Sequence, residues 1–240
     1  MKTGVIVLGM DSGLPDGKRI AEKCAGYLVS AGRKNVRTAY HRGEPSSDAV
    51  MLDMFHQGTD TFAILPLTVS EGKLTVWEMP GKLRLPDNSG SWTILEGKDV
   101  ATRFATALGR DPRMAEALAE REGNPADDTG LLLAAWGSPH SQCRKTAEYY
   151  AGCLRDRGWA AEFGFTGMGV PSVLEAAEKL REQGALRIRI IPLMISADSP
   201  SLSGAFRNLV SLGFDAEMAE PISHIPVFME ILDSKVPEKW

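Results

Sequence analysis

Short runs of consecutive apolar residues alternate along the chain with stretches whose apolar residues recur every three or four positions. The run at 5–8 is rich in β-branched residues, which is typical of a strand buried on both faces of a sheet. Residues 17–31 instead carry apolar side chains at helical spacing, and Gly32 follows as a candidate C-terminal cap. Because strands alternate with helices, the pattern predicts an α/β fold with parallel sheets flanked by helices.

The same order of elements occurs twice in the sequence. A shift of about 126 residues brings residues 3–70 onto residues 129–196 without a gap. Roughly 18 of about 68 aligned positions are identical, where unrelated sequences would give about 4. The identical pairs include Gly4 with Gly130, Ser12 with Ser138, Gly32 with Gly158, Pro45 with Pro171, and Pro66 with Pro192. We therefore predict two homologous half-domains, 1–109 and 129–240, joined at 110–128 by a linker that includes a connecting helix.

Outside the repeated core the two halves differ. In the first half, residues 92–95 predict a fourth strand and residues 100–108 predict a helix. In the second half, we predict a helix at 202–212, a short strand at 214–218 and a closing helix at 227–232. Ligands of open parallel sheets bind beyond the carboxyl ends of the strands. The site is therefore expected in four loops, at 9–14, 68–75, 136–141 and 194–201.

Composition narrows the class of function. The chain has 240 residues, a formal net charge of -4 and no long run of Lys and Arg, which argues against a nucleic-acid-binding protein. The apolar run at 5–10 is too short for a secretory signal or a membrane span. Cys24, Cys143 and Cys153 form no CxxC pair, so we expect free thiols, a cytoplasmic location and no membrane association. Phosphate-binding glycine loops and the Gly-x-Ser-x-Gly hydrolase motif are also missing.

Three segments of the second half carry a resemblance to a known family. A strand ends in Trp-Gly-Ser at 136–138, a helix begins after Pro-Ser at 171–172, and a strand ends in Ile-Pro-Leu at 191–193. The first half has related features at Ser12, Pro45-Ser46 and Leu65-Pro66-Leu67, with Glu78-Met79-Pro80 downstream. In this layout the chain resembles the class II tetrapyrrole chelatases, which include the sirohydrochlorin cobaltochelatases of cobalamin biosynthesis. The resemblance implies a cleft between the two halves and a tetrapyrrole as substrate. It also implies a divalent metal, cobalt first, as second substrate rather than as a permanently bound cofactor.

The chain departs from this family at the motif histidines. The family has a His-Gly-Ser motif after its first strand and a Gly-x-His motif after its third, whose histidines bind the metal or accept the pyrrole protons. Met10 and Trp136 occupy the first place in the two halves. At the second place the first half has Leu74 after Gly72-Lys73, and the second half has Asp198-Ser199-Pro200. Metal insertion needs a ligand such as imidazole and a base with a suitable pKa. The resemblance thus implies a divergent chelatase-like protein, with a non-catalytic paralogue that binds a tetrapyrrole or a partner protein as the alternative.

His140 is the strongest substitute for the missing histidines. It follows Ser138 by two residues in the loop after the first strand of the second half, which makes it a candidate catalytic base. An exposed loop histidine or a helix-capping histidine is the alternative. Together with Asp198, Asp11 and Glu71 it forms a candidate metal site, although each acid also suits a turn or a helix cap.

Other residues of the same loops are candidates for contact with the tetrapyrrole: Ser12, Met10, Trp136, Ser138 and Lys73. Met10 and Trp136 either stack against the macrocycle or plug the cleft, and we favour the plug. Lys73 suits the carboxylates of a sirohydrochlorin-type tetrapyrrole. His41, at the end of the second strand, is expected to be a solvated loop histidine. Because one chain supplies both halves, we expect a monomer or a homodimer.

Overall fold

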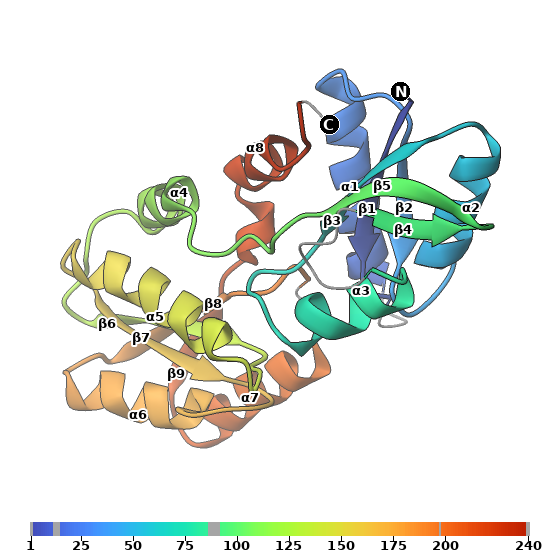
Figure 1. The fold of residues 1–240 in the computed structure, drawn as a ribbon. Helices are drawn as coiled ribbons and strands as arrows, with labels where there is room; N and C mark the ends of the chain where they lie inside the picture. The colour runs from blue at the N-terminus through green and yellow to red at the C-terminus, as the bar shows by residue number, and fades with distance from the viewer. Residues whose placement is uncertain (1, 12–14, 86–91, 197, 239–240) are drawn as a thin grey trace. The chain divides into compact units, whose positions relative to one another are not determined.

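The chain forms two compact α/β units, each with its own sheet and its own hydrophobic core (Figure 1). The computed structural model describes nearly all of it, namely residues 2–11, 15–85, 92–196 and 198–238. The first unit consists of Met1–Leu108 and Met229–Trp240, and the second of Gly109–Phe228. The predicted fold class, parallel sheets flanked by helices, is confirmed.

The first unit contains a sheet with the strand order β2-β1-β3-β5-β4. Its strands are β1 (Thr3–Gly9), β2 (Val36–Tyr40), β3 (Thr61–Pro66), β4 (Trp92–Leu95) and β5 (Lys98–Phe104). Neighbouring strands are parallel except for β4, which is antiparallel to β5. The helices are α1 (Pro15–Ser30), α2 (Ser47–His56), the π-helical turn η1 (Leu74–Glu78), α3 (Met79–Lys82) and most of α8 (Val227–Ser234). Ile6 of β1, Phe62 of β3 and Met54 of α2 belong to one buried cluster.

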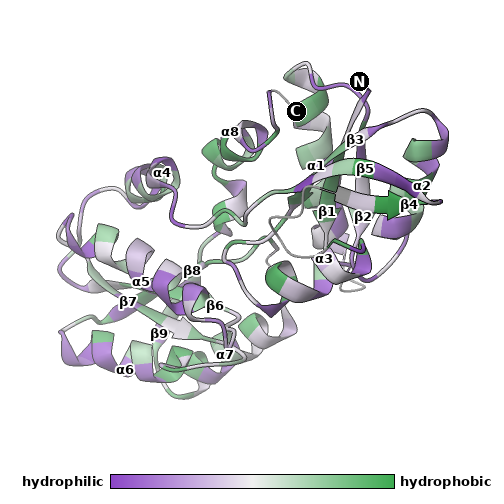
Figure 2. Cartoon of the chain, viewed as in Figure 1, coloured by the Kyte–Doolittle hydropathy of each residue, from purple (hydrophilic) through white to green (hydrophobic). Residues whose placement is uncertain are grey.

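The second unit repeats this plan with the strand order β7-β6-β8-β9, and every pair is parallel. Its strands are β6 (Thr129–Ala135), β7 (Ala160–Phe165), β8 (Arg187–Pro192) and β9 (Asp215–Met218). The helices are α4 (Pro112–Glu122), α5 (Ser141–Arg155), α6 (Val173–Glu182), α7 (Pro200–Ser211) and the short 3-10 helix η2 (Ile222–His224). Leu132 of β6, Ile190 of β8 and Leu180 of α6 share its buried cluster. In Figure 2 the central strands of both units are mostly hydrophobic, while the helices alternate between hydrophilic and hydrophobic residues.

The helix predicted at 100–108 is wrong, because most of this segment is strand β5. Its buried residues Val100, Thr102 and Phe104 recur at every second position, which is the period of a strand. The hairpin to β4 turns at Glu96 and Gly97, which both have positive φ. Two central residues of this kind give a turn whose twist matches paired strands.

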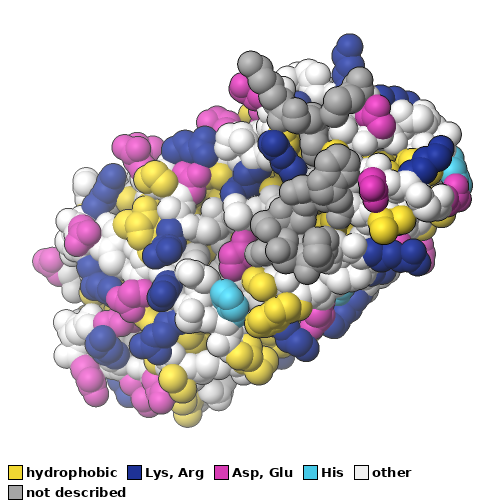
Figure 3. All heavy atoms as spheres, viewed as in Figure 1, with side chains coloured by type: hydrophobic (Ala, Val, Ile, Leu, Met, Phe, Trp, Pro, Cys, Tyr) yellow, Lys and Arg dark blue, Asp and Glu magenta, His cyan; other side chains and the backbone are white. Residues whose placement is uncertain are grey.

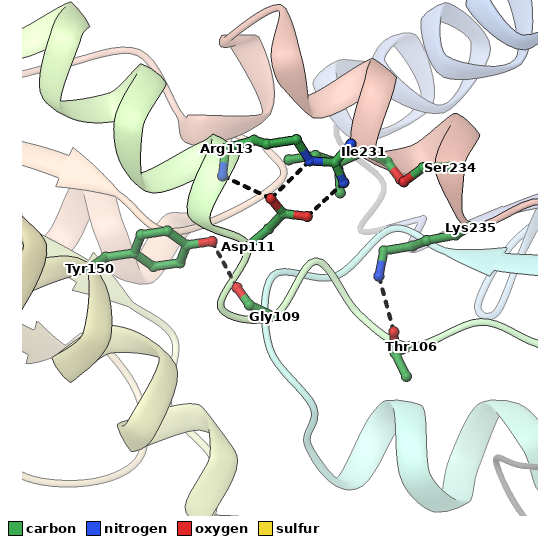
Figure 4. Close-up of polar contacts among 8 residues, drawn as sticks. All are labelled: Thr106, Gly109, Asp111, Arg113, Tyr150, Ile231, Ser234 and Lys235. Atoms are coloured by element: carbon green, nitrogen blue, oxygen red, sulfur yellow. Dashed lines mark hydrogen bonds and ion pairs between the residues drawn. The ribbon is translucent and has the colours of Figure 1, made fainter.

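The unit boundaries differ from the predicted ones at both ends of the second half. The connecting helix predicted between the halves is confirmed as α4, but it belongs to the second unit rather than to a separate linker. It begins with a cap in which the Asp111 side chain accepts a hydrogen bond from the Arg113 backbone N–H at 2.9 Å. Tyr150 donates a hydrogen bond to the Gly109 carbonyl in the same unit, at 2.7 Å (Figure 4). The last residues, predicted to belong to the second half, join the first unit. There Lys235 donates to Thr106 at 3.0 Å.

Two surface properties complete the description of the fold. No helix within the described ranges is long and apolar enough to cross a membrane. On the face shown in Figure 3, Lys and Arg side chains are interspersed with Asp and Glu side chains. This mixture agrees with the small net charge of -4.

Candidate functional site

The expected site loops are held by backbone hydrogen bonds at the carboxyl ends of the strands. In the first unit, the His41 N–H donates to the Gly9 carbonyl at 3.0 Å, and the Asp11 N–H donates to the Arg42 carbonyl at 3.1 Å. These bonds continue the β1–β2 ladder beyond its last pair, Gly9 with Tyr40. Because of that register, His41 follows β2 at the level where Met10 follows β1.

Glu78, at the end of the π-helical turn, is the centre of a charged group in this unit. Its carboxylate accepts Lys73 at 3.1 Å and Arg42 at 3.1 Å. The hydrogen bond from Lys73 is the main cause that lowers the pKa of Glu78, against a smaller opposing effect of burial. The Nε2 atom of His41 lies 3.6 Å from the same carboxylate. π-Helical turns occur frequently at functional sites, so the position of Glu78 supports a role for it there.

His41 is buried, with 9% of its surface exposed, so the prediction of a solvated loop histidine is wrong. Its Nδ1 has no hydrogen-bond partner among the described residues. Lys82 donates to the His41 carbonyl at 3.0 Å. Burial lowers the pKa of His41, and the charges of Lys82 and Arg42 lower it further. The imidazole is therefore neutral at neutral pH, when it can accept a proton or bind a metal.

The residues predicted from the first unit have mixed surroundings. Asp11 forms an ion pair with Lys18 at 2.9 Å. Glu71 accepts a hydrogen bond from the Ala107 backbone N–H at 2.7 Å, which fixes the loop after β3. Lys73 is exposed and binds Glu78 as described above. Met10 is partly buried against the core cluster. The predicted contact residue Ser12 lies outside the described residues.

The residues predicted from the second unit follow β6 and β8. Trp136 directly follows β6 and is 54% exposed, whereas the plug that we favoured would be buried. Ser138 accepts a hydrogen bond from the His140 N–H at 3.1 Å, and His140 is the N-cap residue of α5. Asp198 is exposed, and its N–H donates to the Ser196 hydroxyl at 3.1 Å.

The four residues predicted to bind a metal are divided between the units. Asp11 and Glu71 belong to the first unit, and His140 and Asp198 belong to the second. Over the part of the chain that the structure describes, no three or more His, Cys, Asp or Glu side chains form a group able to hold a metal ion. The four-residue metal site and the catalytic role of His140 remain predictions.

Hydroxyl groups gather at the strand ends of the second unit, a feature that the sequence analysis missed. Thr166, after β7, lies 3.1 Å from the Ser201 hydroxyl, which lies 2.9 Å from that of Ser199. Ser199 also caps α7 by accepting from the Leu202 N–H. The available signal was the Ser-Pro-Ser sequence at 199–201, in which Ser199 is the N-cap of α7 and Ser201 lies in its first turn. Such hydroxyls can donate to substrate carboxylates.

Comparisons with known proteins point to one family. The sequence model of the CbiX family matches residues 4–124. A sirohydrochlorin cobaltochelatase of Sulfurisphaera tokodaii is 33% identical over 110 residues, which make up 45% of this chain and 92% of that protein. A sirohydrochlorin cobaltochelatase of Methanosarcina acetivorans is 25% identical over 122 residues, or 50% of this chain and 94% of that protein.

Solved structures with the same fold cover the whole chain rather than its first half. SirB from Bacillus subtilis with Fe3+ aligns with a TM-score of 0.76 at 15% identity, over 98% of this chain and 94% of that one. CbiX, described as the terminal enzyme for siroheme biosynthesis in denitrifying bacteria, aligns with a TM-score of 0.65 at 22% identity, over 98% of both chains. These likenesses show that both units together have the chelatase fold.

Proposed function

Since this chain belongs to the CbiX family, we propose that it is a divergent chelatase-like protein of tetrapyrrole biosynthesis, which handles a sirohydrochlorin-type tetrapyrrole and a divalent metal. Cobalt is the first candidate metal, because the relatives found by sequence are cobaltochelatases. The metal is a substrate in this proposal, so no resident cofactor is required. The proposed location is the cytoplasm and the proposed functional unit is a monomer or a homodimer.

The observation that supports the proposal most strongly is the group of cations at the strand ends of the first unit. Arg42 and Lys73 both bind Glu78, and Lys82 donates a hydrogen bond to the backbone carbonyl of His41, the residue before Arg42. A sirohydrochlorin-type tetrapyrrole carries carboxylates around its ring. Arg and Lys bind carboxylates through charge-assisted hydrogen bonds, which are stronger than neutral ones. This group is therefore suited to hold the rim of the substrate.

Each unit exposes a tryptophan side chain that suits the flat face of a macrocycle. Trp136 follows β6 and is 54% exposed, and Trp77 of the π-helical turn is 58% exposed. An indole offers a large, rigid apolar face for stacking at small cost in conformational entropy. We therefore assign Trp136 to stacking on the tetrapyrrole, in place of the plug.

Metal insertion also requires a proton acceptor. Two pyrrole protons must leave when a divalent metal enters, and a neutral imidazole is the side chain suited to accept them near neutral pH. His140, half-buried at the N-cap of α5, remains the predicted base. In the alternative, the protein binds a tetrapyrrole without metallating it.

Substrate binding tests the proposal through the visible absorbance of sirohydrochlorin. The double variant Arg42→Gln/Lys73→Gln should bind sirohydrochlorin about tenfold more weakly, the equivalent of about 1.4 kcal/mol. Arg187→Gln is the matched control, because Arg187 begins β8 at the opposite end of a strand and forms an ion pair with Asp128. Equal affinity of the wild type and the double variant would refute the assignment of these cations. An absence of sirohydrochlorin binding by the wild type would refute the function.

A further inference from the structure

Three ion pairs between histidine and glutamate occur among the described residues, and one of them differs from the others. His56 lies 2.8 Å from Glu96, and His224 lies 2.7 Å from Glu220. Both separations are those of hydrogen bonds. His41 Nε2 instead stands 3.6 Å from Glu78 Oε2, which is too long for a hydrogen bond. It is also the buried pair, since the His41 side chain is 8% exposed and that of His56 is 52% exposed.

The 3.6 Å gap between His41 and Glu78 matches two ligands of one metal ion. Nitrogen and oxygen ligands lie about 2.0–2.2 Å from a first-row divalent metal, so two ligands at a tetrahedral angle are about 3.4 Å apart. Glu78 is partly exposed, with 27% of its side chain accessible, so an ion can reach the pair from the Glu78 side. Imidazole and carboxylate together suit cobalt and similar ions.

We propose that His41 and Glu78 form a transient docking site for the divalent metal, completed when tetrapyrrole carboxylates draw Arg42 and Lys73 away from Glu78. The coupling rests on the proposed function, because it requires a polyanionic substrate at these cations. Arg42 and Lys73 now occupy the Glu78 oxygens at 3.1 Å each and repel a cation. A polyanion that binds them frees the carboxylate and cancels their charge. Binding of the tetrapyrrole thereby raises the affinity of His41 and Glu78 for the divalent metal, the second substrate.

Several features suit the site to an ion that must leave again. Among the described residues, no third His, Cys, Asp or Glu side chain joins His41 and Glu78 as a metal ligand. When Nε2 of His41 binds a metal, Nδ1 carries a proton, and no hydrogen-bond acceptor for it lies among the described residues. Loss of such outer hydrogen bonds usually weakens metal binding about 10- to 100-fold. Weak, ligand-poor binding fits a metal that is passed on.

The proposal is tested by cobalt(II) binding to the full-length protein, measured by calorimetry without tetrapyrrole. Arg42→Gln/Lys73→Gln imitates the substrate-bound state, so it should bind cobalt(II) about 5- to 150-fold more tightly than the wild type, the usual range of such coupling. The same double variant should bind sirohydrochlorin more weakly. When His41→Phe or Glu78→Gln is added to this double variant, the increase in cobalt(II) affinity should disappear. Adding His56→Gln, at the hydrogen-bonded pair, should leave it intact.

The proposal is overturned if removal of Arg42 and Lys73 leaves cobalt(II) affinity unchanged. It is also overturned if the gain persists in a folded His41→Phe or Glu78→Gln background. Glu78→Gln keeps the test decisive should the His41 variant fail to fold, because Glu78 is the less buried partner. Since cobalt(II) is titrated alone, this result is independent of sirohydrochlorin binding, and failure of one can be told from failure of the other.

Discussion

At the scale of single residues, the turn after β6 depends on a glycine, Gly137. Gly137 has a φ of +94°, and a Cβ built on it would lie 1.6 Å from the Met168 carbonyl oxygen. The carbonyl of Trp136 accepts hydrogen bonds from the N–H groups of Gly167 and Met168, both at 3.0 Å. The turn after β6 therefore needs glycine both for its dihedral angle and for the close approach of two backbones.

Gly137→Ala should destabilise the protein by at least about 2 kcal/mol, because the left-handed conformation and the backbone clash both oppose it. Gly26→Ala is the matched control. Gly26 lies inside α1, where an added Cβ would meet nothing within 4 Å, so this change should stabilise by about 0.5–1 kcal/mol. Urea unfolding measures both values. A Gly137→Ala variant as stable as the wild type would contradict the account of this turn.

Residue-level predictions from the sequence succeeded where local pattern decides and failed where tertiary packing decides. Gly32 was correctly expected to cap the first helix, since α1 ends at Ser30 and Gly32 has a φ of +91°. His41 was expected to be solvated, yet the β1–β2 ladder and the π-helical turn bury it. The pairing of His41 with Glu78 spans 37 positions of sequence and has no local signal.

At the scale of elements, the duplicated helices α2 and α6 begin differently. Ser172 accepts from the Glu175 N–H at 3.2 Å, and the Glu175 carboxylate accepts from the Ser172 N–H at 2.7 Å. Ser46, the matching residue, makes no side-chain cap. Ser172→Ala should therefore cost about 1 kcal/mol of stability, and Ser46→Ala should cost much less. Equal losses in urea unfolding would contradict the difference between the caps.

The cap of α6 also predicts a dependence on pH. The hydrogen bond from the Ser172 backbone is the main cause that lowers the pKa of Glu175 below its ordinary 4.5. A carboxyl group with a lowered pKa in the folded state stabilises above its unfolded pKa, and the effect is lost as pH falls through the folded value. The wild type should therefore be more stable than Glu175→Gln at pH 7, and the difference should vanish in acid. A constant difference across this range would exclude the ionised cap.

The elements of the repeated core could be predicted because their patterns are strong. The apolar run at 5–8, predicted as a strand, lies in β1 (Thr3–Gly9), and the helical pattern at 17–31 corresponds to α1 (Pro15–Ser30). The helix predicted at 100–108 was wrong because the apolar residues of this short segment fit the period of a helix as well as that of a strand. Its identity as β5 depends on the partner strands β3 and β4, which are tertiary features.

At the scale of the whole molecule, the chain returns to its first unit after the second. Arg33, just after α1, binds Asp233 of α8 with both ends of its guanidinium group, at 2.6 and 3.1 Å. Both side chains are about one quarter exposed, at 27% and 26%. Because the pair is partly buried, it should contribute more to the free energy of unfolding than a fully exposed ion pair does. It fixes the C-terminal segment to the unit that begins the chain.

Asp233→Asn should lower the free energy of unfolding by about 1–2 kcal/mol and raise proteolysis near the C-terminus. Glu148→Gln is the matched control, since its exposed pair with Arg155 should contribute little. The sequence could not predict this return, because the last helix lies beyond the repeated core and its position along the chain places it with the second half. If Asp233→Asn leaves the rate of proteolysis near the C-terminus unchanged, the Arg33–Asp233 ion pair does not fix this segment.

The rate of sirohydrochlorin metallation distinguishes a chelatase from a protein that only binds the tetrapyrrole. Visible absorbance follows cobalt(II) entry in the presence of the wild type, the His140→Ala variant and no protein. The account predicts faster metallation than without protein, with the gain lost in His140→Ala, because a neutral imidazole must accept pyrrole protons. A spectral shift without faster metallation would make the protein a tetrapyrrole binder, the alternative above. No spectral change at all would contradict a function in tetrapyrrole handling. The protein would then have the chelatase fold without binding sirohydrochlorin.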